Sequence, residues 1–219
     1  MAEPSVATPV SPARRLQNRR LYLCTGDRPD LGSFIAACIR GGVDIVQLRD
    51  KQLAALPLLR RAEVAIQVCR EASVPFILND RPDLALACGA DGVHVGQDDA
   101  PPWLARQILG PDAILGRSTH APPELKAAAE EPVDYLSAGP VNPTPTKPGR
   151  PGTGLGYLTQ AARDAAVPWF VTGGVTPDTI GAMVEAGGRR FVVVRYLTEA
   201  HDPEANARRL ATAVERATR

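Results

Sequence analysis

Eight short apolar runs, rich in β-branched residues, recur along the sequence and limit its folding more than any other feature. They begin at residues 21 (LYLCT), 44 (DIVQLR), 75 (PFILND), 92 (GVHVGQ), 113 (AILGRS), 134 (DYLSAG), 168 (PWFVTGG) and 190 (RFVVVR). Most gaps between them carry Ala- and Leu-rich helical patterns, as in residues 54–72, 125–130, 179–186 and 203–217. Continuous apolar strands alternating with helices are typical of parallel strands buried on both faces, and eight such units close into a barrel. We therefore expect an α/β fold, a (β/α)8 TIM barrel of the phosphate-binding type.

An open doubly wound sheet is the alternative architecture, since it has the same alternation of strands and helices. Its dinucleotide-binding form carries GxGxxG after the first strand, whereas this chain has the lone Gly26 followed by Asp27. The barrel accounts for residues 19–219 as a single domain of ordinary size. Residues 1–18 contain three prolines and no periodic apolar pattern, so we expect a flexible N-terminal tail there.

Charge and composition exclude several function classes. With 25 Lys+Arg against 24 Asp+Glu, the formal net charge of +1 argues against a nucleic-acid partner, and anions must be bound locally. No apolar run has the length of a membrane span, and the first residues lack the apolar region of a secretory signal, so we expect a cytoplasmic location. The four cysteines are widely spaced and predicted to be reduced and mostly buried. Small-molecule partners are therefore expected, and the sequence leaves a homo-oligomer open.

Polar residues gather where the expected strands end. The end of the second run carries Gln47, Arg49 and Lys51, where strand alternation places the three side chains on one side. Arginine grips phosphate with two hydrogen bonds and lysine adds a compact charge, so this trio suits a diphosphate. A salt-bridged strand end is the structural alternative. In a barrel, the carboxyl ends of the strands form the active-site face, and polar residues there indicate an enzyme.

Carboxylates close the third and fourth runs, which are neighbours in a barrel. Asp80 follows Asn79, and Asp98 and Asp99 follow Gln97. Magnesium takes one or two protein carboxylates and completes its shell with water and substrate phosphates, so we expect Mg²⁺ here. Each aspartate has an alternative structural role as a turn or helix-cap residue.

Two later segments offer further phosphate contacts. The segment 139–150 is too rich in proline and glycine for regular structure, and we expect a mobile loop whose Thr144, Thr146 and Lys147 close over phosphates. An ordinary surface linker is the alternative. Gly173 and Gly174 end the seventh run, where backbone N–H groups can approach a monophosphate; a tight turn explains them equally well. His94, inside the fourth run, is best interpreted as a hydrogen-bonded structural histidine.

Six short motifs occur in order at these strand ends: QLRDK at 47–51, NDR at 79–81, HVGQDD at 94–99, GRSTH at 116–120, GP at 139–140 through TPTK at 144–147, and GG at 173–174. In this combination the chain resembles the thiamine phosphate synthase (thiamine-phosphate pyrophosphorylase) family over nearly all of residues 21–200. The resemblance implies a transferase of thiamine biosynthesis. Such enzymes couple hydroxymethylpyrimidine diphosphate with a thiazole phosphate, or its carboxylated form, to give thiamine phosphate and pyrophosphate.

The resemblance also implies roles for individual residues. The expected pyrimidine diphosphate contacts are Gln47, Arg49, Lys51, Asn79, Ser118 and Lys147, with Lys51, Ser118 and Lys147 counted as catalytic. The expected thiazole phosphate contacts are Thr144, Thr146, Gly174, Val194 and Arg195. Asp80 and Asp99 would bind magnesium. The chain departs from the family at Asp50, where glutamate is usual, and at Arg195, where serine is common; Pro145 would stiffen the loop.

Two rival functions remain open at this point. A thiazole tautomerase has the same fold and would use His120 as its base, but it has no use for the two magnesium aspartates or Lys147. A catalytically silent barrel that binds phosphorylated ligands is the second. Turnover of both substrates with release of pyrophosphate discriminates among all three.

Overall fold

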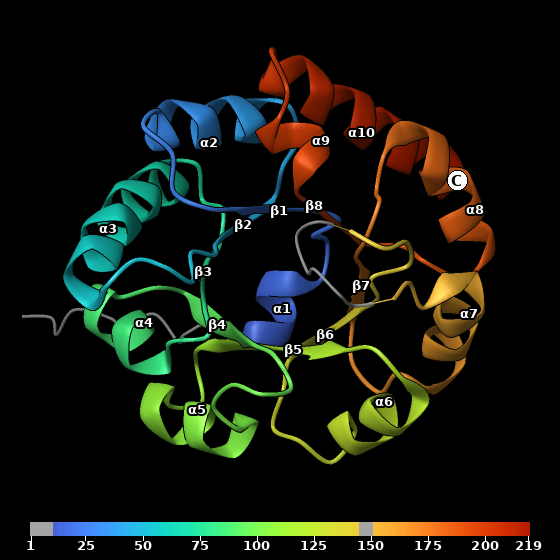
Figure 1. Cartoon of the computed structure of the whole chain (residues 1–219), viewed down its shortest axis with the longest axis horizontal. Helices are drawn as coiled ribbons and strands as arrows, with labels where there is room; N and C mark the ends of the chain where they lie inside the picture. The colour runs from blue at the N-terminus through green and yellow to red at the C-terminus, as the bar shows by residue number, and fades with distance from the viewer. Residues whose placement is uncertain (1–10, 145–150) are drawn as a thin grey trace, which may run out of the picture.

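The chain forms a closed barrel of parallel strands (Figure 1). The computed structural model describes residues 11–144 and 151–219. The strands run in sequence order around the barrel: β1 Leu21–Thr25, β2 Ile45–Leu48, β3 Phe76–Asn79, β4 Gly92–Val95, β5 Ile114–Thr119, β6 Tyr135–Ala138, β7 Trp169–Val171 and β8 Phe191–Val193. Closure is made by β1, which pairs in parallel with both β2 and β8. The expected eight strands and the TIM barrel are confirmed, and the doubly wound alternative is excluded.

A ring of helices covers the outside of the barrel (Figure 1). The ring consists of α2 Leu31–Arg40, α3 Ala55–Glu71, α4 Pro82–Cys88, α5 Pro102–Leu109, α6 Pro122–Ala128, α7 Gly154–Asp164, α8 Pro177–Glu185 and α10 Pro203–Ala217. The short helix α9 Arg195–Thr198 lies inside the ring, beside α10. Several of them begin with proline, whose fixed φ and missing N–H suit the first helical position. The predicted helix at 203–217 is matched exactly. The one predicted at 125–130 begins earlier, because Pro122 starts α6.

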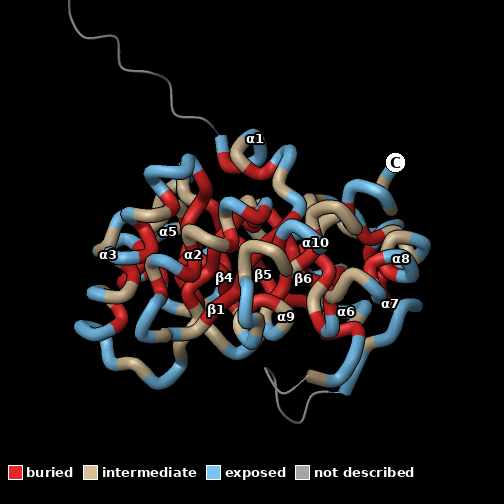
Figure 2. Tube along the Cα trace, turned by 90° about the horizontal axis from the view of Figure 1, so that it is seen from above, coloured by how far each residue is buried: buried red, intermediate tan, exposed pale blue. Residues whose placement is uncertain are grey.

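Two apolar clusters hold the layers together. The larger lies between the strands and the inward faces of the helices, and the smaller fills the barrel interior. Figure 2 shows the buried residues, in red, along the strands and on parts of the surrounding helices. The interior cluster consists of Leu16, Tyr22, Ile45, Ile77, Ile114, Tyr135 and Phe170. Strand side chains alternate between the two clusters, as the period of a β-strand requires. The barrel interior beneath the mouth is therefore packed with side chains.

The N-terminal segment corrects one expectation. Residues 1–18 were expected to be a flexible tail, but Pro12–Leu16 form the short helix α1, and Pro12 and Leu16 are buried. Leu16 is fully buried in the interior cluster, so α1 closes the barrel at its N-terminal end. Figure 2 shows α1 at one end of the barrel and α9 toward the other. Residues 1–10 lie outside the described part of the chain.

Candidate active site

A pocket of about 510 Å³ opens at the carboxyl ends of the strands. Its walls include every expected site residue that the structure describes: Gln47, Arg49, Lys51, Asn79, Asp80, Asp99, Ser118, Thr144, Gly174, Val194 and Arg195. Thr146 and Lys147 lie outside the described residues. The fold thus brings together, from most of the strands, side chains that are up to about 150 positions apart in the sequence.

One wall of the pocket carries a lysine between two carboxylates. Nζ of Lys51 lies 2.9 Å from Oδ2 of Asp80 and 3.9 Å from Oδ1 of Asp99. Both carboxylates are largely buried, whereas about half of the Lys51 side chain is exposed to the pocket. Because Asp80 follows β3 and Asp99 follows β4, the parallel pairing of these strands places the two acids together.

The two carboxylates compete for one proton. Burial and the neighbouring Asp99 raise the pKa of Asp80, more than the Lys51 ammonium lowers it. Burial also acts to raise the pKa of Asp99, but hydrogen bonds from Asp80 and from the Gly96 N–H hold it below its usual value. Of the two carboxyls, Asp80 is therefore the one that takes up a proton first as the pH falls. A cation bound between the two carboxylates would relieve their mutual repulsion.

The backbone at Asp80 argues against a purely structural role. Its φ of 63° lies in the left-handed region, which non-glycine residues rarely adopt, and such strain gathers at functional sites. The structural alternative of a helix cap is not supported, because the N-cap of α4 is Arg81 and no side chain caps that helix. Asp99 does accept the Gly96 N–H at 2.8 Å, so it has a turn-forming role as well.

Arg49 and its neighbours line the same side of the pocket. β2 ends at Leu48, so Arg49 and Lys51 lie in the following loop rather than in the strand. Among the described residues Arg49 makes no ion pair, which disfavours the salt-bridge alternative for this cation. Gln47 and Asn79 are buried at 5% and 7% exposure, with side chains on the pocket floor. The pocket therefore presents a cation over neutral polar groups.

The opposite wall is formed by the turns after β7 and β8. Gly173 and Gly174 have φ of 97° and 78°. A Cβ at Gly173 would lie 2.5 Å from Cβ of Pro140, and one at Gly174 would lie 2.7 Å from Nδ2 of Asn142. Both positions therefore require glycine for the turn and its close packing, which agrees with the tight-turn interpretation and leaves backbone groups open to the pocket.

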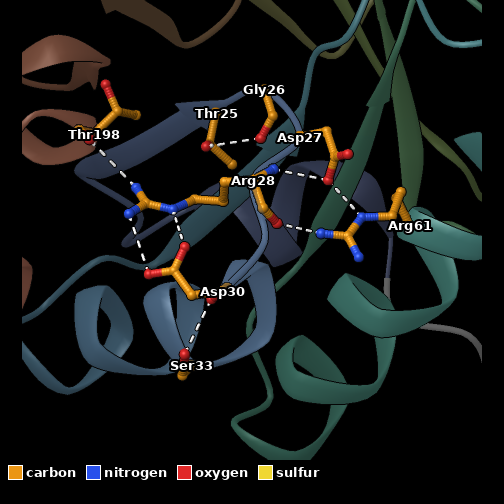
Figure 3. Close-up of polar contacts among 8 residues, drawn as sticks. All are labelled: Thr25, Gly26, Asp27, Arg28, Asp30, Ser33, Arg61 and Thr198. Carbon is orange, nitrogen blue, oxygen red and sulfur yellow. Dashed lines mark hydrogen bonds and ion pairs between the residues drawn. The ribbon is translucent and has the colours of Figure 1, made fainter.

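The short helix α9, whose first residue is Arg195, is held by the loop after β1 (Figure 3). Arg28 donates to both oxygens of Asp30, at 2.6 and 3.2 Å, and to the carbonyl of Thr198 at 3.3 Å. Its guanidinium lies 3.8 Å over the ring of Phe34. Arg61 of α3 donates to the Arg28 carbonyl. These contacts fix the end of α9 and with it the wall that carries Arg195.

The pocket floor contains residues that sequence analysis did not select. Tyr22, Cys24 and Ser137 line it together with His94, and all four are buried. The hydrogen-bonded structural role expected for His94 is confirmed, because its ring contacts Tyr135 and Ser118. The available signal was strand parity: Tyr22 and Cys24 occupy alternate positions in LYLCT, on the face that turns inward.

Two further observations concern the rival interpretations and the metal. The Nδ1 atom of His120 contacts the carbonyl of Gly139, and His120 also lines the pocket. Within residues 11–144 and 151–219, no group of three or more His, Cys, Asp or Glu side chains forms a metal cluster. The pair Asp80 and Asp99 is nevertheless a donor set that fits a hard cation completed by substrate phosphates. In the same ranges, no helix has the length and apolar character needed to cross a membrane.

Comparisons with known proteins show the family of the chain. The model of the thiamine monophosphate synthase family matches residues 21–197. A thiamine-phosphate synthase of Thermobifida fusca is 50% identical, with 90% of this chain and 93% of that protein covered. Another, from Mycobacterium tuberculosis, is 47% identical over 91% of this chain and 96% of that protein. The solved thiamine phosphate pyrophosphorylase of Pyrococcus furiosus superposes with a TM-score of 0.83 at 28% identity, covering 94% of this chain and 98% of that one. On its sequence, its barrel and the residues gathered at the barrel mouth, the chain belongs to the thiamine monophosphate synthase family.

Proposed function

We propose that this chain is a thiamine-phosphate synthase, a transferase that joins hydroxymethylpyrimidine diphosphate to a thiazole phosphate and releases pyrophosphate. The family membership and the relatives named thiamine-phosphate synthase support this function. The single observation that carries it to this chain is the cluster of Lys51, Asp80 and Asp99 in one pocket with Arg49, which makes no ion pair with the residues that the structure describes. A tautomerase would have no use for this arrangement. The cytoplasmic location and a homo-oligomer stay predictions.

The pyrimidine diphosphate is assigned to the side of the pocket that follows β2 to β5. Its diphosphate would be held by Arg49 and Lys51, which supply positive charge, and by Ser118 and Asn79, which supply hydrogen bonds. Gln47, on the pocket floor, would contact the pyrimidine ring of the substrate. Lys147 belongs to the same proposed set, although it lies outside the described residues.

Magnesium is proposed between Asp80 and Asp99, whose paired oxygens fit the cation as argued above. Bound there, Mg²⁺ would neutralise charge that grows on the leaving diphosphate. Lys51, 2.9 Å from Asp80, would then be released from its ion pair to contact a diphosphate oxygen. The positive charge of Arg49 would act on the same leaving group.

The thiazole phosphate is assigned to the wall made by the turns after β6, β7 and β8. Thr144, Gly174, Val194 and Arg195 line that wall, and Thr146 is proposed to join them from outside the described residues. In the reaction the bond from the pyrimidine methylene carbon to the diphosphate oxygen breaks, and the thiazole nitrogen supplies the electron pair of the new bond. Two anchored anions align carbon and nitrogen, so positioning takes the place of a protein nucleophile.

The test is turnover of both substrates together, with thiamine phosphate and pyrophosphate appearing in equal amounts. In this assay Asp80→Asn and Asp99→Asn should each raise the magnesium concentration needed for half-maximal rate by at least about tenfold, because each removes one charged ligand. Asp83→Asn is the matched control: Asp83 of α4 is exposed, and among the described residues its one ion pair is with Arg81, so its loss should leave the magnesium dependence unchanged.

Each rival gives a different result in the same experiment. A tautomerase would isomerise the thiazole without the pyrimidine diphosphate, and a silent binding barrel would bind both compounds without turnover. Normal magnesium dependence in both aspartate variants would remove the pair from the proposed metal site while leaving the synthase function standing.

A further inference from the structure

Seven buried side chains form one hydrogen-bonded chain inside the barrel, beneath the pocket. Its members come from five different strands and are each no more than 7% exposed: Cys24, Gln47, Tyr22, Tyr135, His94, Ser118 and Ser137. The substrate contacts proposed above use only Gln47 and Ser118. Three titratable rings therefore connect two substrate-binding groups without a role of their own.

The distances allow the chain to be followed atom by atom. Cys24 Sγ donates to Gln47 Oε1 at 3.0 Å, and Gln47 Nε2 donates to the Tyr22 hydroxyl at 2.9 Å. The hydroxyls of Tyr22 and Tyr135 are 2.9 Å apart. The Tyr135 hydroxyl lies 3.0 Å from Nδ1 of His94.

The far end of the chain is the Ser118 hydroxyl. Nε2 of His94 lies 2.9 Å from Oγ of Ser118, and Ser137 donates to the same oxygen at 3.4 Å. Ser118 lines the pocket, so any hydrogen bond that its own proton makes to a ligand is made there.

The amide of Gln47 sets the direction of the whole chain. The Tyr22 oxygen accepts the Gln47 N–H, so the Tyr22 hydroxyl donates its own hydrogen bond to Tyr135. The Tyr135 hydroxyl then donates to Nδ1 of His94. The ring proton of His94 is therefore on Nε2, which donates to Ser118. In the opposite direction the buried Tyr22 proton would have no acceptor among the described residues, which is costly. Rotating the Gln47 amide by 180° would supply an acceptor for the Tyr22 proton. It would also point the amide N–H at the Cys24 sulfur, which is a weak acceptor.

Packing holds the two tyrosine hydroxyls in place and keeps them protonated. Burial raises the pKa of both Tyr22 and Tyr135 well above the usual value, so both remain hydrogen-bond donors across the physiological range. Phe170 packs edge-on against both rings. Room for the Tyr135 ring exists because residue 116 is glycine: a Cβ there would lie 2.1 Å from Cζ of Tyr135.

We propose that Tyr22, Tyr135 and His94 are positioning residues that commit the Ser118 hydroxyl to donating its proton into the pocket, toward an oxygen of the bound diphosphate. Both lone pairs of Ser118 are used by His94 and Ser137, so its hydrogen is directed to an acceptor such as an anion. The inference rests on the proposed function for the identity of the ligand. The hydrogen-bond chain itself belongs to the unliganded protein and can be tested without turnover.

The first test reads the tautomer of His94 directly. The protein has three histidines, so ¹⁵N spectra of histidine-labelled protein contain few signals. The signals that are missing from the spectrum of His94→Asn belong to His94. The expected spectrum has a protonated Nε2 and an unprotonated Nδ1, and in Tyr135→Phe the Nδ1 signal should shift because it loses the hydrogen bond donated by the Tyr135 hydroxyl. A wild-type His94 protonated at Nδ1 would overturn the proposal, whatever reaction the protein catalyses.

The second test is a double-mutant cycle. Tyr135→Phe keeps the ring and removes the hydroxyl, and it should lower kcat/KM for the pyrimidine diphosphate, and affinity for pyrophosphate in calorimetry, by about tenfold. In a Ser118→Ala background the same substitution should have no further effect, because Tyr135 acts through Ser118. Losses that multiply in the double variant would mean a general packing role and reject the proposal.

A matched control distinguishes an effect of the hydrogen-bonded side chains from a general effect of removing a buried tyrosine hydroxyl. Tyr157 is 6% exposed, and its hydroxyl donates to the Ala121 carbonyl at 3.4 Å and also bonds the Thr119 side chain, which belongs neither to the hydrogen-bonded chain nor to the pocket lining. Tyr157→Phe should leave both kcat/KM and pyrophosphate affinity unchanged. If the wild-type protein turns over neither substrate, the proposed function is wrong. The tautomer of His94 and the pyrophosphate titrations still test the role of the hydrogen-bonded side chains.

Discussion

Arg49 and Lys51 are cations of the same loop, yet their neighbours give them different tasks. Lys51 is paired with Asp80, so in the proposed site it would leave that carboxylate to contact the ligand. Arg49 makes no ion pair within the described residues and faces the pocket, so its charge is available before any substrate arrives. An anion that binds beside a guanidinium offsets the cost of its desolvation, so we expect Arg49 to be the main fixed charge for the proposed diphosphate.

Two substitutions on opposite walls of the pocket test which wall binds each of the two substrate anions. Arg49→Ala should weaken binding of pyrimidine diphosphate by about 10- to 100-fold, the value of a lost charged hydrogen bond, and affect thiazole phosphate much less. Arg195→Ala, on the opposite wall, should show the reverse preference. Calorimetric titration of both variants with both ligands measures this. Equal losses for the two ligands would mean that the pocket is divided differently.

The sequence was informative about these residues because strand ends and parity are local. Gln47, Asn79 and Ser118 could be placed at the barrel mouth from the apolar run that each one ends. Tyr22 and Tyr135 could not be paired from the sequence, because they are 113 positions apart and each resembles an ordinary apolar strand residue. Their contact follows only from the closed barrel and the space left by Gly116.

At the scale of elements, the two ends of the barrel are closed by very different helices. The eight strands were predictable because alternating apolar runs and helical patterns define them independently of long-range contacts. The helix α1 was missed, since its sequence PARRL carries only one large apolar residue and follows two prolines. Its stability comes from tertiary contact: Leu16 inserts among Ile45, Ile77 and Ile114.

This origin predicts how α1 responds to substitution. Leu16→Ala should lower the free energy of unfolding by about 2–5 kcal/mol, because it empties a fully buried site in the barrel interior. Arg14→Ala, on the exposed face of the same helix, should change it by less than about 0.5 kcal/mol. Urea denaturation of the two variants provides the comparison. Equal, small effects would restore the interpretation of this segment as a loose tail.

At the scale of the whole molecule, the end of the barrel opposite the pocket has one hydrogen-bonding arrangement that recurs at several strands. An aspartate directly precedes each of β2, β4 and β6: Asp44, Asp91 and Asp134. Each accepts a backbone N–H near the start of the preceding strand: Asp44 from Arg20 and Leu21, Asp91 from Phe76, and Asp134 from Leu115. The corresponding position before β8 is Arg190, so the pattern is broken where the barrel closes. These carboxylates tie strands in pairs on the face that serves stability rather than catalysis.

Asp44 makes this arrangement sensitive to pH. Burial raises the pKa of its carboxyl to about 6 from 3.8, although hydrogen bonds from the Arg20 and Leu21 N–H groups act to lower it. The folded protein therefore binds this proton more tightly than the unfolded chain does. The stability contributed by the proton is complete below about pH 4, declines as the pH rises, and is lost above about pH 6.

Comparison with a variant that cannot titrate isolates this effect. Between pH 4 and 7, the free energy of unfolding of the wild type should fall by up to about 3 kcal/mol relative to that of Asp44→Asn, the value of a pKa raised by about two units. Because both proteins share every other titrating group, their difference removes the remaining pH dependence. Urea denaturation at intervals of about one pH unit measures the difference, and ¹³C titration of the Asp44 carboxyl should give a midpoint near 6. A difference that grows in favour of the wild type over the same interval would show that the two N–H bonds outweigh burial, and that the carboxylate is the form the fold prefers.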